Sequence, residues 1–160
     1  MLDKTIQLRG EQLTSKEKGK IKKALLDLHN LEIMATNVYR CQITNRYPEL
    51  KVNLIGAMKN EMGHVQDYLV KLFEYDFTPA WYRWVFWMVG WVIGTGSRIQ
   101  GKKGILKAGI WTESKAVKHY EELLEIAPWD EETFRVIDKD RQDEVQHLEL
   151  WTGLLKAMEG

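Results

Sequence analysis

The stretch that decides the fold is Asn60-Glu61-Met62-Gly63-His64, which returns in related form as Asp143-Glu144-Val145-Gln146-His147. In each copy a Glu precedes a His by three residues, so on a helix the two side chains lie about 60° apart and can share a metal ion. Both copies lie in segments whose apolar residues recur every three or four positions, which predicts helices. One Glu-x-x-His is common on solvated helix faces, but its repetition favours a metal centre.

Two further acidic residues complete the repeat. Glu32 precedes Glu61 by 29 residues and Glu113 precedes Glu144 by 31. Each lies on an apolar helix stripe, where an unpaired ionised carboxylate would be very costly. The sequence therefore predicts two helix hairpins that contribute four Glu and two His to one site, the ligand set of ferritin-like di-iron and di-manganese proteins. The predicted metal ligands are Glu32, Glu61, His64, Glu113, Glu144 and His147. A polar core of Glu and His satisfied by hydrogen bonds is the alternative.

The periodicity predicts one all-α domain over residues 1–160, a ferritin-like four-helix bundle. Its helices are expected at 14–45, 48–75, 102–127 and 130–158. Thr14-x-x-Glu17 is a capping-box pattern, Pro48 suits the first turn of a helix, and Asp130 is a good N-cap. Between the second and third helices lies a connection of roughly 25 residues, the long crossover that distinguishes ferritin-like bundles from up-and-down ones.

The crossover, at about 79–99, is expected to carry an extra amphipathic helix. Trp81, Trp84, Trp87 and Trp91 fall within one sector of about 120° on a helix. The uncharged run from Trp84 to Ser97 would span about 21 Å as a helix, short of the roughly 30 Å of a bilayer core. Basic residues flank it, as in segments that lie in a membrane interface. We therefore expect these four Trp to contact the membrane or an apolar substrate; packing on the bundle or on a second subunit is the alternative.

The overall composition excludes several classes of protein. With 23 Lys+Arg against 23 Asp+Glu, nothing favours nucleic acid as a partner. The single Cys, Cys41, cannot form an internal disulfide or a thiolate metal knuckle. Residues 1–10 have no apolar core of a signal peptide. We expect a cytoplasmic protein, peripheral on the inner face of the membrane.

The ligand set also predicts the metal. Four carboxylates neutralise two divalent ions, and hard oxygen ligands with imidazole suit iron, or manganese as the alternative, better than copper or zinc. Asn60 and Asp143, each directly before a motif Glu, are expected to support the site from outside. Asn60 would accept from His147 and Asp143 from His64, which fixes the imidazole tautomers.

Several further motifs extend a resemblance beyond the ligands. Pro79 and Trp84 precede a glycine-spaced apolar segment, and Glu113 is followed by the pair His119-Tyr120. His29-x-x-Glu32 and the segment from Asp143 to His147 complete the pattern. With these motifs the chain resembles, from about residue 25 to 150, the demethoxyubiquinone hydroxylase family, di-iron monooxygenases of ubiquinone biosynthesis. The glycines of the segment are Gly90, Gly94, Gly96, Gly101 and Gly104.

The resemblance implies a di-iron oxygenase that hydroxylates a membrane-borne quinol-type aromatic lipid with O2 and an unidentified electron donor. It further implies that His119 and Tyr120 relay protons or electrons between ring and metals. The chain departs from the family at Leu31, Ile33 and Met34, which replace Gly, Tyr and Gly around the first ligand, and at 107–112. These departures lie where the substrate would approach, so the substrate does not carry over.

Two other functions compete with this one. A rubrerythrin-like peroxide scavenger or an iron-handling protein could use the same six ligands without any membrane contact. The lack of a Cys-rich rubredoxin module disfavours the first, and the Trp-rich crossover disfavours iron storage. A membrane-docked scaffold with a structural dinuclear metal is the third candidate, although four buried carboxylates are a costly way to join helices. A homo-oligomer is compatible with each of them.

Overall fold

The computed structural model describes residues 6–160, which form α-helices and no strand. Residues 1–5 lie outside the described range. The prediction that residues 1–10 contain no signal peptide therefore falls partly outside it. The helices are α1 (Ser15–Gln42), α2 (Pro48–Glu74), α3 (Arg83–Ile99), α4 (Gly101–Ile126) and α5 (Glu131–Glu159). The prediction of an all-α protein is confirmed, and each bundle helix ends within three residues of its predicted bounds.

Local signals set several of these helix ends. Thr14 and Glu17 form the predicted capping box at the start of α1, and the Asp130 side chain accepts from the backbone N–H groups of Glu132 and Thr133 at the start of α5. Pro48 is the first residue of α2. The first helix is shorter than expected because Ile43 adopts φ −56° and ψ 123°, which is not helical.

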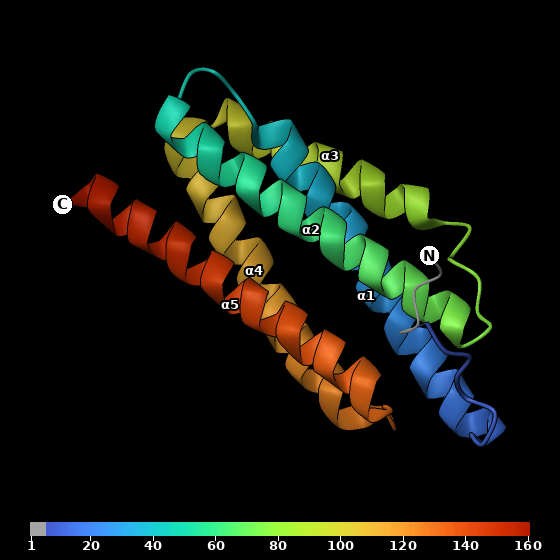
Figure 1. Ribbon diagram of the computed structural model, residues 1–160. Coiled ribbons are helices and arrows are strands. Elements are labelled where there is room, and N and C mark those ends of the chain that lie inside the picture. The colour runs from blue at the N-terminus through green and yellow to red at the C-terminus, as the bar shows by residue number, and fades with distance from the viewer. Residues whose placement is uncertain (1–5) are drawn as a thin grey trace.

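Two antiparallel hairpins make up the bundle. In Figure 1, α1 pairs with α2, α4 pairs with α5, and α3 lies along α1 as a fifth helix. The connection from α2 runs back along the molecule through α3, so α4 begins beside the turn between α1 and α2. This is the predicted ferritin-like arrangement with its long crossover.

Two hydrophobic clusters fill the ends of the bundle and leave a polar region between them. One cluster holds Leu25, Leu28 and Leu72 with Ile137, and the other holds Leu50, Leu54, Ile105 and Leu106 with Trp151. All of these side chains are nearly inaccessible to solvent. Burial of this apolar surface stabilises the fold from both ends, and the middle is the region in which the predicted ligands lie.

A glycine face holds α3 against α1. A Cβ on Gly90 would lie 2.3 Å from the Met34 carbonyl oxygen, and one on Gly94 would lie 2.5 Å from that of Val38. Only glycine permits so close an approach of two backbones. The Asn37 side chain also donates to the carbonyl oxygen of Trp87 at 2.6 Å. One side of α3 therefore does pack on the bundle.

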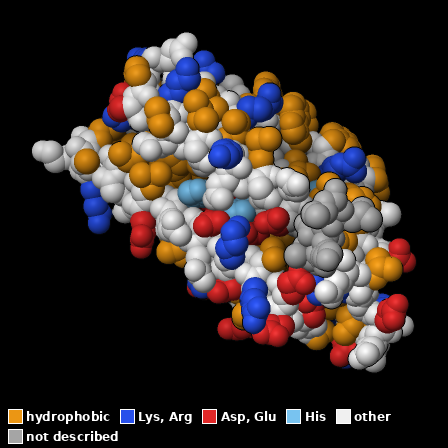
Figure 2. Space-filling view, viewed as in Figure 1, with side chains coloured by type: hydrophobic (Ala, Val, Ile, Leu, Met, Phe, Trp, Pro, Cys, Tyr) orange, Lys and Arg blue, Asp and Glu red, His pale blue; other side chains and the backbone are white. Residues whose placement is uncertain are grey.

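The other side of α3 faces outward. Trp81, Trp84, Trp87 and Trp91 are between 42 and 80% exposed, and Figure 2 shows hydrophobic side chains with Lys and Arg among them along the edge where α3 lies. Within residues 6–160, none of the helices combines the length and the apolar character that a membrane crossing requires.

Candidate metal centre

The six predicted ligands converge at the middle of the bundle. Their donor atoms form two groups, each with all atoms within 4.8 Å of one another. Glu61 and Glu144 belong to both groups. The first group adds Glu32 and His64, and the second adds Glu113 and His147. Each group could hold a cation, and each has one Glu and one His of its own in addition to the two carboxylates that belong to both groups.

The inward-facing atoms of this cluster are buried but unsatisfied. Both carboxylate oxygens of Glu61 and of Glu144, Oε2 of Glu113, and Nδ1 of His64 and of His147 find no hydrogen-bond partner within residues 6–160. Buried polar atoms are nearly always paired, so a convergent set of unpaired oxygens and nitrogens points to ions between them. The donor set, hard oxygens with two imidazoles, fits two iron or manganese ions.

The histidines present the same nitrogen to the centre. Nδ1 of His64 lies 3.0 Å from Glu144, and Nδ1 of His147 lies 3.1 Å from Glu61. On its outer side, Nε2 of His64 lies 3.3 Å from Oδ2 of Asp143, the partner that the sequence analysis expected for it. A hydrogen on Nε2 leaves the Nδ1 lone pair free for a metal ion.

The expected contact between Asn60 and His147 is not what the structure shows. The Asn60 side-chain amide instead donates to Asp143 Oδ2 at 3.3 Å, the same oxygen that faces His64. The Asn60 side chain therefore orients the carboxylate that in turn orients His64. The sequence analysis paired Asn60 with His147 because Asp143 was paired with His64. The two helices are not related closely enough in height and rotation for both contacts to form.

Two tyrosines hold the end carboxylates, and only one of them was predicted. Tyr120 donates to Oε1 of Glu32 at 2.6 Å, and Tyr39 donates to Oε1 of Glu113. Tyr39 was not singled out from the sequence, although a signal existed. Each Tyr lies seven residues after an end carboxylate on its own helix, so the two halves of the chain share this spacing as well.

Burial and mutual charge shift the titration of the cluster in the metal-free protein. Burial, and then the charge of Glu144, raise the pKa of Glu32 and of Glu113 well above its usual range. For Glu144 burial acts in the same direction, but the close imidazoles of His147 and His64 outweigh it and lower the pKa to about 2. Burial lowers the pKa of His147, but contacts with Glu144 and Glu61 outweigh it and raise the pKa to about 9. Without metal, protons on Glu32, Glu113 and His147 therefore offset the negative charge of the cluster.

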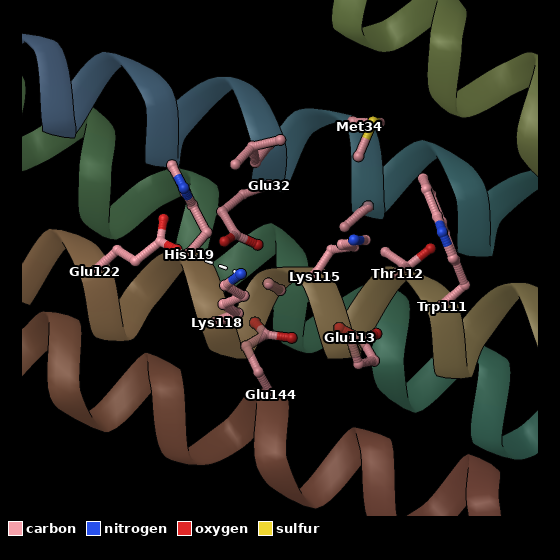
Figure 3. Close-up of a pocket in the computed structure, with 13 residues that line it drawn as sticks. Glu32, Met34, Trp111, Thr112, Glu113, Lys115, Lys118, His119, Glu122 and Glu144 are labelled. Atoms are coloured by element: carbon pink, nitrogen blue, oxygen red, sulfur yellow. Dashed lines mark ion pairs between the residues drawn. The ribbon is translucent and has the colours of Figure 1, made fainter.

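A cavity of about 510 Å³ opens onto the centre between α1 and α4. Figure 3 shows the Glu32 and Glu144 side chains pointing toward each other from α1 and α5 at its floor, with His119 beside Glu32. The imidazole of His119 thus faces the cavity. Three departures from the family pattern, Leu31, Met34 and Trp111, form walls of the same cavity.

The four tryptophans of the crossover do not line this cavity. A second hollow, of about 410 Å³, runs between α3 and α4 and is lined by Val92, Ile93 and Trp111 among others. Trp111 borders both cavities. The Trp111 side chain therefore separates the hollow beside α3 from the cavity that opens onto the carboxylates.

His29 lies apart from the ligand cluster. It is buried, and its Nδ1 has no hydrogen-bond partner in the part of the chain that the structure describes. Burial, and then the charge of Arg83, lower the pKa of His29 to about 4. The imidazole is therefore neutral at physiological pH, and it belongs to neither four-residue group.

Comparison with known proteins gives one result. The sequence model of one family, described as ubiquinone biosynthesis protein COQ7, matches residues 21–153. The matched range contains all six residues of the centre, the whole of α3 and both tyrosines that hold the end carboxylates. No curated protein matches the chain.

Proposed function

The chain belongs to the COQ7 family of ubiquinone biosynthesis proteins, and from that premise we propose that it is a di-iron monooxygenase. It would hydroxylate the ring of a quinol-type lipid. One oxygen atom of O2 enters the ring and the other leaves as water, with two electrons from an external donor and two protons from solvent. The observation that carries the proposal is the pair of four-residue groups that share Glu61 and Glu144.

The ligand set supports two ions held in a fixed arrangement. Glu32 and His64 would hold one ion, Glu113 and His147 the other, and Glu61 and Glu144 would bridge them. Four carboxylates balance two divalent charges, so binding removes the cost of burying these groups together. When bound, iron supplies the reaction with O2 and the oxidising power toward the ring.

The residues of the cavity would bind and orient the substrate. Leu31, Met34 and Trp111 offer apolar and aromatic surface to a ring, and exclude water from the carboxylates behind it. His119 faces the same space and has an unpaired buried Nε2 within residues 6–160. His119 would exchange a proton with a ring hydroxyl, while Tyr120 donates a hydrogen bond to Glu32.

The lipid would come from a membrane on which α3 rests. The exposed Trp side chains of α3 are of the kind that anchors proteins at the level of lipid headgroups. Lys107, Lys115 and Lys118 lie on the exposed side of α4, and the latter two line the mouth of the cavity. Anionic headgroups would thus contact α4 while α3 lies in the interface, which directs the mouth of the cavity toward the bilayer.

The metal proposal is tested by the iron content of the purified protein and of Glu61→Ala, with Glu125→Ala, an exposed carboxylate of α4, as the control. We expect two iron ions per chain in the wild type and in the control and fewer than one in Glu61→Ala, because each ion loses a shared ligand. The reduced wild type, supplied with a quinol lipid and ¹⁸O2, should form a product with one ¹⁸O atom. Consumption of O2 with no oxygenated product, or rapid reoxidation by H2O2 but not by O2, would rule out the hydroxylase.

The membrane proposal is tested by flotation with vesicles that contain anionic phospholipid. Replacing Trp84, Trp87 and Trp91 together by Ser should abolish flotation, whereas Phe134→Ser, which changes an exposed aromatic side chain of α5, should leave it unchanged. Equal flotation of both variants would show that α3 is not the contact surface.

A further inference from the structure

An aromatic residue follows every carboxylate of the centre at the same interval. Tyr39, Tyr68, Tyr120 and Trp151 lie seven residues after Glu32, Glu61, Glu113 and Glu144. Seven residues are nearly two helical turns, so each aromatic side chain lies on the face of its carboxylate about 10 Å further along the axis. All four are almost completely buried. They therefore continue the site toward both ends of the bundle.

These residues form two hydrogen-bonded chains that end on the two outer carboxylates. In one, Tyr68 donates to Tyr120 at 2.9 Å and Tyr120 donates to Glu32 at 2.6 Å. In the other, the indole N–H of Trp151 donates to Tyr39 at 2.9 Å and Tyr39 donates to Glu113. The chains occupy equivalent positions in the two halves of the molecule, but they differ in the residue at which they start.

That difference fixes the direction of one chain. An indole N–H can only donate, whereas a phenol can donate or accept. If Glu113 were to donate to Tyr39, the single hydroxyl hydrogen of Tyr39 could not turn to Trp151. The Tyr39 hydroxyl must therefore donate its hydrogen bond to Glu113. The Tyr68 hydroxyl can accept as well as donate, so the chain that ends on Glu32 can reverse.

Tight packing supports the fixed chain. The ring centroids of Tyr39 and Trp151 lie 5.6 Å apart, and the ring of Tyr39 meets His147 edge-on at 6.4 Å. Gly109, four residues before Glu113 on α4, makes room for the indole, since a Cβ there would lie 2.9 Å from its Cδ1 atom. The Tyr39 ring thus packs between Trp151 and His147, and its hydroxyl contacts Glu113.

We propose that Trp151 is a positioning residue: through Tyr39 it holds Oε1 of Glu113, which lies 3.9 Å from Nδ1 of His147, and so fixes the orientation of this carboxylate at its end of the centre. Oε2 is the oxygen of Glu113 that has no hydrogen-bond partner in the described chain. The carboxylate at the Glu113–His147 end of the centre is consequently held in one orientation. The Glu32–His64 end is the one whose carboxylate can change its hydrogen bond.

The inference rests on the proposed metal centre, and metal binding to the apoprotein tests the two separately. Cobalt(II) is the probe, because its visible absorption reports coordination number, and the proteins are the wild type, Trp151→Phe and Tyr68→Phe. The wild type should bind two ions; failure to do so would refute the metal centre itself. In Trp151→Phe, Tyr39 loses the donor that fixes its hydroxyl hydrogen toward Glu113. One of the two ions should therefore bind about 10-fold more weakly, the lower limit for loss of a direct outer-shell partner, and its absorption band should change.

Tyr68→Phe is the matched control, because it removes the first residue of the other chain. It should change either affinity by no more than threefold, since Tyr120 still donates to Glu32. Gly109→Ala is an independent variant that displaces the indole and keeps every hydrogen-bonding group. It should show the weaker binding and the changed absorption band expected of Trp151→Phe, and it tests the role of the indole even if Trp151→Phe fails to fold. Equal effects of the two Phe variants, or a wild-type spectrum in Gly109→Ala, would overturn the role of Trp151.

Discussion

At the scale of single residues, Asp143 decides which nitrogen of His64 faces the carboxylates. Its Oδ2 atom lies 3.3 Å from Nε2, and Asp140 lies 3.6 Å from the same nitrogen. A hydrogen on Nε2 has acceptors on this outer side, whereas one on Nδ1 would point into the space assigned to a metal ion. Asp143 therefore favours the tautomer in which the lone pair of Nδ1 faces the carboxylates.

Replacing Asp143 by Ala should weaken metal binding 10- to 100-fold, because the imidazole loses the acceptor that fixes its tautomer and orientation. Competition with a chelator of known affinity measures the change. Asp138→Ala is the control, since Asp138 contacts Arg141 and Gln142 on the surface of the same helix. If both variants bound metal as tightly as the wild type, Asp143 would have no part in the site.

The residues of the site divide into those that spacing reveals and those that it does not. Glu61 and His64 lie on one helix, so their relation follows from the helical repeat alone. Asp143 was paired correctly with His64 across the bundle, but Asn60 was not paired correctly with His147. Contacts between helices depend on axial rotation and height, which no interval within one helix determines. The hydrogen bond from Trp151 to Tyr39 joins residues 112 positions apart and is of this second kind.

At the scale of elements, α3 combines two faces with different roles. Its glycine face sets the distance to α1, and its tryptophan face stays exposed. The sequence predicted a helix in this segment from its composition and periodicity. Of the four Trp expected on one face of it, Trp81 lies instead in the turn before α3. The sequence did not predict α1 as the partner, because the five glycines of the segment do not reveal which two meet a backbone.

Alanine at two glycines of α3 should therefore have opposite effects on stability. Gly90→Ala puts a Cβ 2.3 Å from the Met34 carbonyl oxygen, so α3 must shift, and we expect a loss of about 1–3 kcal/mol in the free energy of unfolding. Gly96 has no described atom within 4 Å of the added Cβ, so Gly96→Ala should stabilise the helix by about 0.5–1 kcal/mol. Urea denaturation measures both; changes of the same sign would mean that α3 is not held by close backbone contact.

At the scale of the whole molecule, Arg9 adds a polar link between the two hairpins, which the hydrophobic clusters already join. Its guanidinium bonds to Glu74 at the end of α2 at 2.7 Å and to Asp130 at the start of α5 at 2.6 Å. It also contacts Glu132, which accepts from Lys71 of α2 at 2.9 Å. The cluster fastens the two hairpins at the end that lies opposite the turn between α1 and α2.

Arg9→Gln should reduce stability in a pH-dependent manner. The pKa of Asp130 is lowered, because hydrogen bonds from Tyr75 and Thr133 and the charge of Arg9 outweigh burial, which raises it. A hydrogen bond from Lys71 is the largest cause that lowers the pKa of Glu132, and Arg9 adds to it. Groups with lowered pKa stabilise the fold above their ordinary values, 3.8 and 4.5, and this stability is lost as the pH falls.

We therefore expect Arg9→Gln to lose about 3 kcal/mol at pH 7, where Glu74 is left buried with one partner fewer, and progressively less between pH 5 and pH 3. Urea unfolding across this range measures the difference. Arg135→Gln breaks only an exposed pair with Glu131 and should cost less than about 0.5 kcal/mol at every pH. A loss for Arg9→Gln that does not vary with pH would show that these carboxylates are not coupled to Arg9.

The course of the chain between its two hairpins also bears on how such a protein can diversify. Because α2 ends where α5 begins and α4 begins at the far end of the bundle, any chain that repeats this hairpin must carry a return segment about as long as the bundle. None of the six ligands lies on that segment, and only its glycine face is constrained. Substitutions on its outer face leave the six residues of the centre in place. Descendants of one such ancestor could thus change the outer surface of α3 while the geometry of the centre is inherited unaltered.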